Sequence, residues 1–197
     1  MSGMKELVFA TNNPNKLREV RPFFEKLGIR LITLKEAGSD HETEEDGLTY
    51  AENARKKAYE AAMLLKRPAV ADDSGIAVDA LGGEPGIHSA RFAPAGERCN
   101  EILRRMEGKE NRRAYLETAV SLVFPDGREI TSFHRVAGLI TDKKTGENNF
   151  GYDRIFYYEK AGCTFAEMSM EEKSRVSHRG VAFQKLIEKI EEEKIDL

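Results

Sequence analysis

The sequence predicts an α/β protein with a mixed, twisted sheet, flanking helices and two lobes around a central cleft. Short apolar segments alternate with helical patterns over residues 7–81, which is typical of parallel strands. Later, Ala114–Phe124 and Glu129–Ile140 flank the turn Pro125-Asp-Gly127, which predicts an antiparallel hairpin. A chain of 197 residues is long enough for one domain with two lobes, so we expect residues 1–197 to form a single domain.

The first strand and helix are predicted at the N-terminus. Leu7–Ala10 is an apolar strand, and the polar loop Thr11–Lys16 follows it. A helix with an apolar face comes next and ends at Gly28, because glycine readily adopts the left-handed conformation of a helix end. Pro22 is expected to kink this helix or to end its first turns. Ile29–Leu34 reads as the second strand.

A second helix and two further strands precede the middle of the chain. Thr49 and Glu52 have capping-box spacing, which predicts a helix that starts at Thr49. Val70–Ala71 is the third predicted strand and is expected to end at the following pair of aspartates. Ile76–Leu81 is expected to form a fourth strand.

The second half of the chain adds two helices and a short strand to the hairpin. Glu97–Met106 has a helical pattern, and Phe150–Tyr158 is aromatic and predicts a short strand. A last helix is expected from about Ser177 to Glu193, with Ser177 as its N-cap.

The composition favours a globular protein without a cysteine-based site or a membrane-spanning segment. Hydrophobic residues make up 40% and charged residues 33% of the chain, and the net charge of -3 gives no basis for general nucleic-acid binding. Cys99 and Cys163 are far apart and predict neither a zinc site nor a disulfide framework. No apolar segment reaches membrane-spanning length, so we expect a cytoplasmic protein without a membrane partner.

Two adjacent carboxylates, Asp72 and Asp73, stand at the centre of the functional prediction. They follow a buried strand and precede Ser74 and Gly75. Charges at a sheet edge can be offset by a cation, and carboxylate oxygens suit Mg²⁺. The alternative is a solvated turn, since Asp, Ser and Gly are common in turns.

The loop Thr11–Lys16 is a candidate phosphate site. It joins a strand to a helix, where exposed amide hydrogens and the helix dipole favour an anion, and Lys16 adds a positive charge. The alternative is an ordinary turn. The loop consists of Thr11, Asn12, Asn13, Pro14, Asn15 and Lys16.

Three further segments carry candidate residues. The acidic loop at residues 41–47 is either a solvated surface or a source of a second metal-binding carboxylate. The run Phe150–Asp153 either packs in the core or brackets a flat base. The basic segment Lys173–Arg179 is either a solvated helix entrance or a set of hydrogen-bond donors, and His178 is one of these.

Taken together, these segments resemble the inosine triphosphate pyrophosphatase family, in order and nearly from end to end. The match comprises Thr11–Lys16, Glu44–Ala54, Ala71–Gly75, Leu81–Gly86 with Ser89–Phe92, Phe150–Asp153, and Glu172-Lys173 with Ser177–Arg179. Each motif alone is weak, but the ordered set is specific. Members of this family remove ITP, dITP and XTP from the nucleotide pool.

The resemblance implies a homodimeric, Mg²⁺-dependent enzyme that hydrolyses non-standard purine nucleoside triphosphates to the monophosphate and pyrophosphate. By motif, Glu45 and Asp73 would hold the metal, Asp73 would accept a proton from water, and Asp72 would support it. Lys16 would stabilise the departing pyrophosphate. The remaining substrate-binding positions would be Thr11, Asn12, Asn13, Pro14, Asn15, Ser74, Phe150, Gly151, Tyr152, Asp153, Lys173, His178 and Arg179.

A physical argument for base choice accompanies this assignment. His178 or Arg179 donating to a 6-keto oxygen would favour hypoxanthine and xanthine, because adenine would place an amino donor against a donor. The sequence departs from the family at Asn148 and Asn149, where two glycines are common, and at Arg154, where proline is usual. All three positions adjoin the expected base pocket.

Two other functions fit parts of the pattern. One is a related pyrophosphatase of the Maf-like group, which acts on dTTP or UTP; the segment Ser177–Arg179 argues against it. The other is a regulator that binds nucleotides without cleaving them, for which the paired aspartates and acidic loop are more than binding requires.

Overall fold

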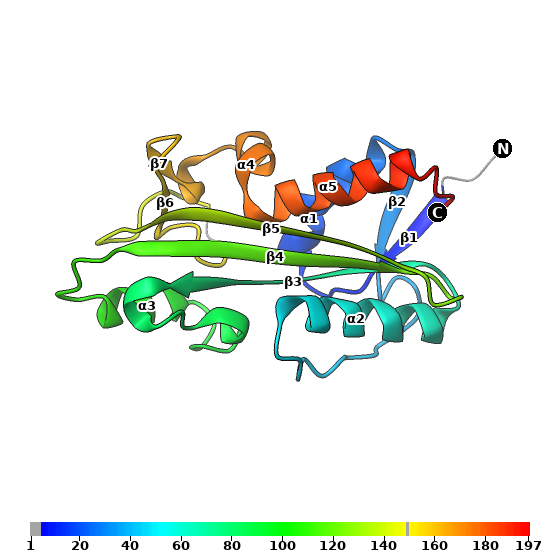
Figure 1. The fold of residues 1–197 in the computed structure, drawn as a ribbon, viewed down its shortest axis with the longest axis horizontal. Coiled ribbons are helices and arrows are strands. Elements are labelled where there is room, and N and C mark those ends of the chain that lie inside the picture. The colour runs from blue at the N-terminus through cyan, green and yellow to red at the C-terminus, as the bar shows by residue number, and fades with distance from the viewer. Residues whose placement is uncertain (1–4, 149) are drawn as a thin grey trace. The chain divides into compact units, whose positions relative to one another are not determined.

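The computed structural model describes residues 5–148 and 150–197, and it confirms the predicted mixed α/β sheet (Figure 1). Seven strands follow the order β2-β1-β3-β4-β5-β6-β7. β1 pairs in parallel with β2 and β3, whereas β6 pairs antiparallel with β5 and β7. The strands are β1 (Lys5–Phe9), β2 (Ile29–Thr33), β3 (Ala69–Val78), β4 (Arg113–Val123), β5 (Glu129–Ile140), β6 (Phe156–Tyr158) and β7 (Cys163–Thr164).

Five α-helices and three short 3₁₀ helices complete the secondary structure of the described residues. The α-helices are α1 (Pro14–Glu25), α2 (Tyr50–Leu65), α3 (Arg98–Arg105), α4 (Met170–Val176) and α5 (His178–Glu192). The 3₁₀ helices are Asp79–Leu81, Gly86–His88 and Phe165–Glu167. None of the helices that the structure describes is long and apolar enough to cross a bilayer.

The chain forms two compact units, and β3, β4 and β5 each contribute to both. The first unit contains the chain as far as Asp73, together with Thr118–His134 and Arg179–Leu197. The second contains Ser74–Glu117 and Arg135–His178.

In the first unit, helices cover both faces of the sheet (Figure 1). Phe9 and Val70 face α1 and α5, where Phe24 and Phe183 complete a core cluster. The opposite face carries small residues that pack against the alanines of α2, including Ala69 and Ala71 of β3 with Ala58, Ala61 and Ala62 of α2. Because successive side chains of a strand point to opposite faces, β3 offers Val70 and Asp72 to one layer and Ala71 and Asp73 to the other.

The second unit has its own core. Ile102 of α3 packs with Ile76, Phe156 and Phe165, and the rings of Phe156 and Phe165 are 5.1 Å apart. This core fixes the short strands β6 and β7, which would be marginal without tertiary packing.

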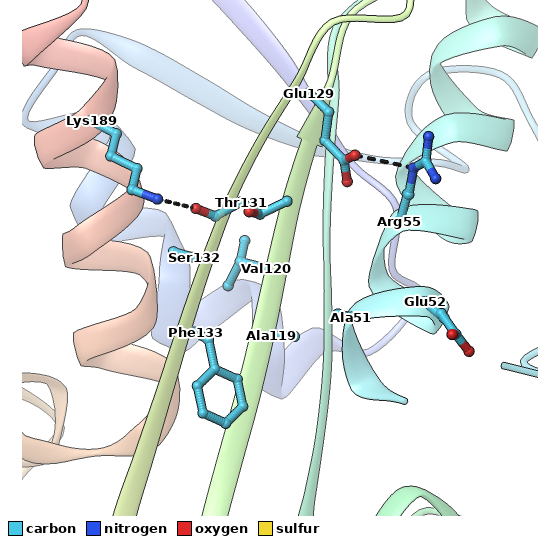
Figure 2. A pocket seen from close by; sticks show the side chains of 10 residues that line it. All are labelled: Ala51, Glu52, Arg55, Ala119, Val120, Glu129, Thr131, Ser132, Phe133 and Lys189. Atoms are coloured by element: carbon cyan, nitrogen blue, oxygen red, sulfur yellow. Dashed lines mark hydrogen bonds and ion pairs between the residues drawn. The ribbon is translucent and has the colours of Figure 1, made fainter. Parts of the chain in front are cut away.

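The N-terminal part of β5 borders a groove of about 480 Å³ in the first unit (Figure 2). Phe133 lies in this groove and is 48% exposed. On one side Arg55 pairs with Glu129 at 3.1 Å, and on the other Lys189 Nζ donates to the carbonyl of Thr131 at 2.6 Å (Figure 2). A lysine on strand carbonyls discourages pairing with another strand.

Several element boundaries differ from the predictions. β3 does not end at Asp72 and Asp73 but continues to Val78, so Ile76–Leu81 is not a separate strand. The strand persists because charged and amide groups of other elements satisfy both carboxylates. Pro22 does not end α1, so of its two predicted effects a helix end is wrong. Pro22 is exposed, so water can reach the carbonyl that it leaves without a donor.

The C-terminal segment also differs. The predicted helix is confirmed over His178–Glu192, but α4 and β7 precede it and were not predicted. Ser177 ends α4 as its C-cap. The hairpin of β4 and β5 lies close to its predicted bounds.

Candidate active site

The loop between β1 and α1 is ordered by its own side chains. Asn13 caps α1, and its Oδ1 accepts from the amides of Asn15 at 3.0 Å and Lys16 at 3.4 Å. Thr11 Oγ1 accepts from the Asn13 amide at 3.1 Å. The prediction of exposed amides for an anion is therefore wrong for Asn13, Asn15 and Lys16. What the loop offers a ligand is the Lys16 ammonium together with side chains, of which Asn12 is exposed.

Asp72 lies on the face of β3 that meets α1 and α5, and its side chain is fully buried. Lys16 Nζ is 3.1 Å from Asp72 Oδ1, and Arg179 Nε donates to Oδ2 at 3.0 Å. Burial alone would raise the pKa of Asp72, but Lys16 and Arg179 outweigh it and hold the pKa far below the usual range. Asp72 is therefore an ionised anchor for two cations.

Arg179 and Lys16 respond differently to this burial. Arg179 Nη1 also donates to Glu19 at 2.6 Å. Burial opposes its charge, but Glu19 and Asp72 outweigh that effect and raise the pKa of Arg179. For Lys16 the balance is reversed, because burial lowers its pKa more than Asp72 raises it. Lys16 is thus the cation of this cluster that gains most from a further anion such as phosphate.

Asp73 lies on the opposite face of β3, toward α2. Asn53 Nδ2 donates to Asp73 Oδ2 at 3.0 Å, and Lys57 Nζ is 3.9 Å from Asp73 Oδ1. Burial raises the pKa of Asp73, the charge of Glu45 raises it further, and Lys57 and Asn53 oppose both only in part. A carboxylate with a raised pKa is a better proton acceptor than an ordinary aspartate.

The acidic loop reaches Asp73 through Lys57 and Asn53. Lys57 Nζ contacts Glu45 Oε1 as well as Asp73, so both carboxylates share one cation. Asn53 Oδ1 accepts from the Gly47 amide at 2.9 Å. A side chain at Gly47 would come within 2.6 Å of Asn53 Oδ1, which explains why glycine occupies this position. The loop is therefore not a loose solvated surface at Glu45.

The residues here fit a magnesium ion, although they do not form a complete cage. No set of three or more His, Cys, Asp or Glu side chains converges anywhere in residues 5–148 or 150–197. Mg²⁺ usually needs only one or two carboxylates, with waters and phosphate oxygens as the other ligands. Glu45 and Asp73 are close enough to share the Lys57 ammonium, and such a pair suits a divalent cation.

The second unit holds the aromatic segment and its basic partner. Lys173 and Asp153 are both buried and form an ion pair at 2.5 Å. Lys173 Nζ also lies 5.3 Å from the centre of the Phe150 ring, within cation–π range. Gly151 has a positive φ of 57°, which lets the chain turn between the two rings.

Tyr152 anchors this segment to the loop that follows β3. Its hydroxyl donates to the carbonyl of Ser89 at 2.6 Å, and burial raises its pKa, so the phenol stays neutral. Ser89 Oγ in turn accepts from the Ile76 amide at 2.8 Å. Tyr152 therefore packs in the core, which is one of the two interpretations of Phe150–Asp153 that the sequence allowed.

The remaining predicted residues lie as follows. His178 is 5% exposed at the start of α5, so a solvated helix entrance is wrong for His178 and for Arg179, which is 3% exposed. Ser74 follows Asp73 on β3. The amide of Asn148 donates to the carbonyl of Ala166 at 3.2 Å, whereas Asn149 lies outside the described residues.

Three functional candidates were missed by the sequence reasoning: Glu19, Asn53 and Lys57. Asn53 and Lys57 are one helical turn apart on α2, beside the buried alanines. A polar pair at this spacing on an otherwise small, apolar face is a signal that could have been found. Glu19 carries no such signal, because its role depends on Arg179, which is 160 residues away in the chain.

The mixed sheet, with charged clusters on the two faces of β3, defines an α/β protein with a candidate active site. Residues 7–189 match the sequence model of the Ham1 family. The chain therefore belongs to the Ham1 family.

Relatives and solved structures agree with this membership. The chain is 43% identical over 180 residues to a dITP/XTP pyrophosphatase of Desulfotalea psychrophila, which covers 89% of this chain and 81% of the relative. It is 42% identical over 197 residues to the protein of the same name from Geobacillus kaustophilus, with 96% of each chain covered. The Ham1 protein of Staphylococcus aureus superimposes with a TM-score of 0.85 at 38% identity, covering 96% of this chain and all of that one.

Proposed function

We propose that this protein hydrolyses non-standard purine nucleoside triphosphates, namely ITP, dITP and XTP, to the monophosphate and pyrophosphate. The observation that carries the proposal is the contrast on β3, where Asp72 is locked to two cations and Asp73 has a raised pKa. Relatives that are 42–43% identical are named dITP/XTP pyrophosphatases, which supports the same substrate class here.

In the proposed reaction, Asp73 accepts the proton of the attacking water as the phosphoanhydride between the α- and β-phosphates is cleaved. Lys16 binds phosphate oxygens and stabilises the departing pyrophosphate. Asp72 does not react; it positions Lys16 and Arg179. Mg²⁺ held by Glu45 and Asp73 would neutralise the charge of the phosphates when bound. Asn53 fixes the orientation of the Asp73 carboxylate.

The base pocket is proposed in the second unit. Phe150 offers a ring for stacking, and Lys173 is held beside it by Asp153. His178 is the proposed donor to the 6-keto oxygen, because Arg179 already donates to Asp72 and Glu19. A buried donor there disfavours adenine, which presents its own donor.

The proposed enzyme is a homodimer in the cytoplasm. Support for a second copy comes from the resemblance and from Phe133, a half-exposed ring in the groove of Figure 2. Sedimentation of the purified protein measures this directly: a dimer is expected, and a monomer at all concentrations would contradict it.

Pyrophosphate release from ITP, dITP, XTP, GTP, ATP, dTTP and UTP, with and without Mg²⁺, tests the function. Release from the first three that requires Mg²⁺ is expected. Preference for ATP would contradict the donor argument, and preference for dTTP or UTP would favour the pyrimidine-specific alternative. Binding without release would indicate a nucleotide-binding regulator.

A further inference from the structure

Three cations gather around the segment Phe150–Asp153 in the second unit. Arg154 directly follows Asp153, and its backbone carbonyl accepts from the amide of Thr145, the residue after Lys144, at 2.8 Å. Arg98 begins α3, and its neighbour Cys99 donates to the carbonyl of Gly151 at 3.4 Å. Three separate parts of the chain therefore bring positive charge to the same segment.

The positive charge of these residues is not compensated by ion pairs. The nearby carboxylate of Asp153 is paired with Lys173. Within the described part of the chain, no ion pair joins Arg98, Lys144 or Arg154 to a carboxylate, and the Nε atoms of both arginines are buried without a hydrogen-bond partner. Buried donors and unpaired cations in one place favour an anion.

The Cys99 thiol lies close enough to these cations for their charges to act on its pKa. Burial raises its pKa and Asp153 adds to the rise, whereas Lys144, Arg154 and Arg98 all act to lower it. Their charges therefore converge on Cys99, whose sulfur contacts the backbone of Gly151 in the proposed base pocket.

The two purine bases of the proposed substrates differ in charge. Xanthine has a second ring carbonyl, which withdraws electrons, so its nucleotide loses a ring proton near neutral pH and the base becomes an anion. Hypoxanthine lacks this carbonyl and stays neutral under the same conditions. A positive field at the base pocket thus acts on XTP and not on ITP.

We propose that Arg154, supported by Arg98 and Lys144, is a specificity-determining residue that favours the ionised xanthine base and shifts selectivity from ITP toward XTP. This inference rests on the proposed function and deepens it.

The test compares kcat/KM for XTP and ITP in the wild type, Arg154→Gln and Arg154→Lys across the pH range in which xanthine ionises. Arg154→Gln is expected to lower the XTP/ITP ratio about threefold to tenfold where xanthine is ionised. Arg154→Lys keeps the charge and is expected to retain the ratio. At lower pH, where both bases are neutral, the wild type and Arg154→Gln are expected to converge.

Other ionisable groups lie around the proposed base pocket, but they are the same in the wild type, Arg154→Gln and Arg154→Lys. They are the Asp153–Lys173 pair, His178, Cys99 and Tyr152, in addition to Arg98 and Lys144. The difference between the wild type and Arg154→Gln therefore isolates the charge of Arg154. Arg98→Gln and Lys144→Gln are expected to move the ratio in the same direction by less, and they serve if Arg154→Gln does not fold.

An unchanged ratio in a folded Arg154→Gln overturns the inference; if both substrates lose activity equally, Arg154 has a purely structural role. A change in ratio that persists when xanthine is neutral also contradicts it. If the wild type releases pyrophosphate from neither substrate, the proposed function itself fails. Release with an unchanged ratio leaves the function intact and removes only the role of Arg154.

Discussion

Asp72 and Asp73 are neighbours on one strand, yet they lie in opposite electrostatic environments. Asp72 faces α1 and α5 and contacts two cations, whereas Asp73 faces α2 and shares Lys57 with another carboxylate. The pKa of the first is lowered and that of the second is raised. The alternation of a β-strand is enough to separate them, because it sends adjacent side chains to different layers.

This contrast shows how one short motif supplies two roles. A carboxylate held by two buried cations is a poor base, but it positions those cations firmly. A carboxylate with a raised pKa accepts a proton more readily, but its ionised form is costly to bury. The first role belongs to stability and positioning, and the second to chemistry.

The largest effect is expected for Asp73→Asn. The amide cannot accept the proton of water, so kcat/KM for ITP should fall by about 10² to 10⁴. Stability at neutral pH should be equal to or above that of the wild type, because a carboxylate whose burial is unfavourable has been removed. Pyrophosphate release and urea denaturation measure the two quantities, and near-normal turnover would remove Asp73 from its role.

Asp72→Asn should act mainly on stability. It leaves Arg179 and Lys16 buried beside a neutral amide, which should cost about 3–5 kcal/mol of unfolding free energy. Asp126→Asn is the matched control, since it removes a carboxylate from the exposed pair with Arg128 and should leave stability nearly unchanged. Equal stability of the two variants would contradict the assignment of Asp72 as an anchor.

Lys57→Gln sharpens the comparison on the side of Asp73. Lys57 lowers the pKa of Asp73, so its removal should move the acid limb of the kcat/KM profile to higher pH. We also expect a loss of about tenfold in kcat/KM at neutral pH, because Glu45 and Asp73 lose their shared cation. An acid limb that stays in place would show that Asp73 does not control it.

The pH dependence of stability should separate the two carboxylates with a smaller effect. The pKa of Asp72 is lower in the folded state, so its contribution is present above the ordinary value of 3.8 and is lost as pH falls through the folded pKa. Asp73 has the opposite sign, so its ionisation reduces stability as pH rises through its raised pKa.

Denaturation of both Asn variants from acid to neutral pH measures these slopes. The deficit of Asp72→Asn should shrink toward acid pH, and any gain of Asp73→Asn should vanish there. Parallel curves for the two variants would mean that the carboxylates share one environment.

The sequence predicts most of the elements because their patterns are local. The hairpin and the Thr49 cap of α2 depend on nearby residues, and both are found in the structure. The other half of the predicted capping box differs, because the Glu52 side chain accepts from the Leu48 amide and not from that of Thr49. β3 was predicted to stop at Asp72 because two charges rarely continue a buried strand. Its continuation depends on Lys16 and Arg179, which satisfy Asp72 from 56 and 107 residues away.

In the candidate site, too, features that depend on nearby residues were predicted and those that depend on distant residues were not. Its motif residues were predicted, but the separate roles of Asp72 and Asp73 depend on which helix covers each face of β3. The amides of Asn15 and Lys16 were wrongly predicted to be exposed, because Asn13 caps the helix and accepts from both with its own side chain. Glu19 could not be found, since its partner Arg179 comes from the last helix.

The most direct test of the contrast is to follow the side-chain carboxyl carbons of labelled aspartate by NMR during a pH titration, with Asp72→Asn and Asp73→Asn to assign the signals. We expect Asp73 to titrate above the ordinary value of 3.8, while Asp72 stays ionised until the protein unfolds in acid. Two signals that titrate together near that value, or in the reverse order, would contradict it.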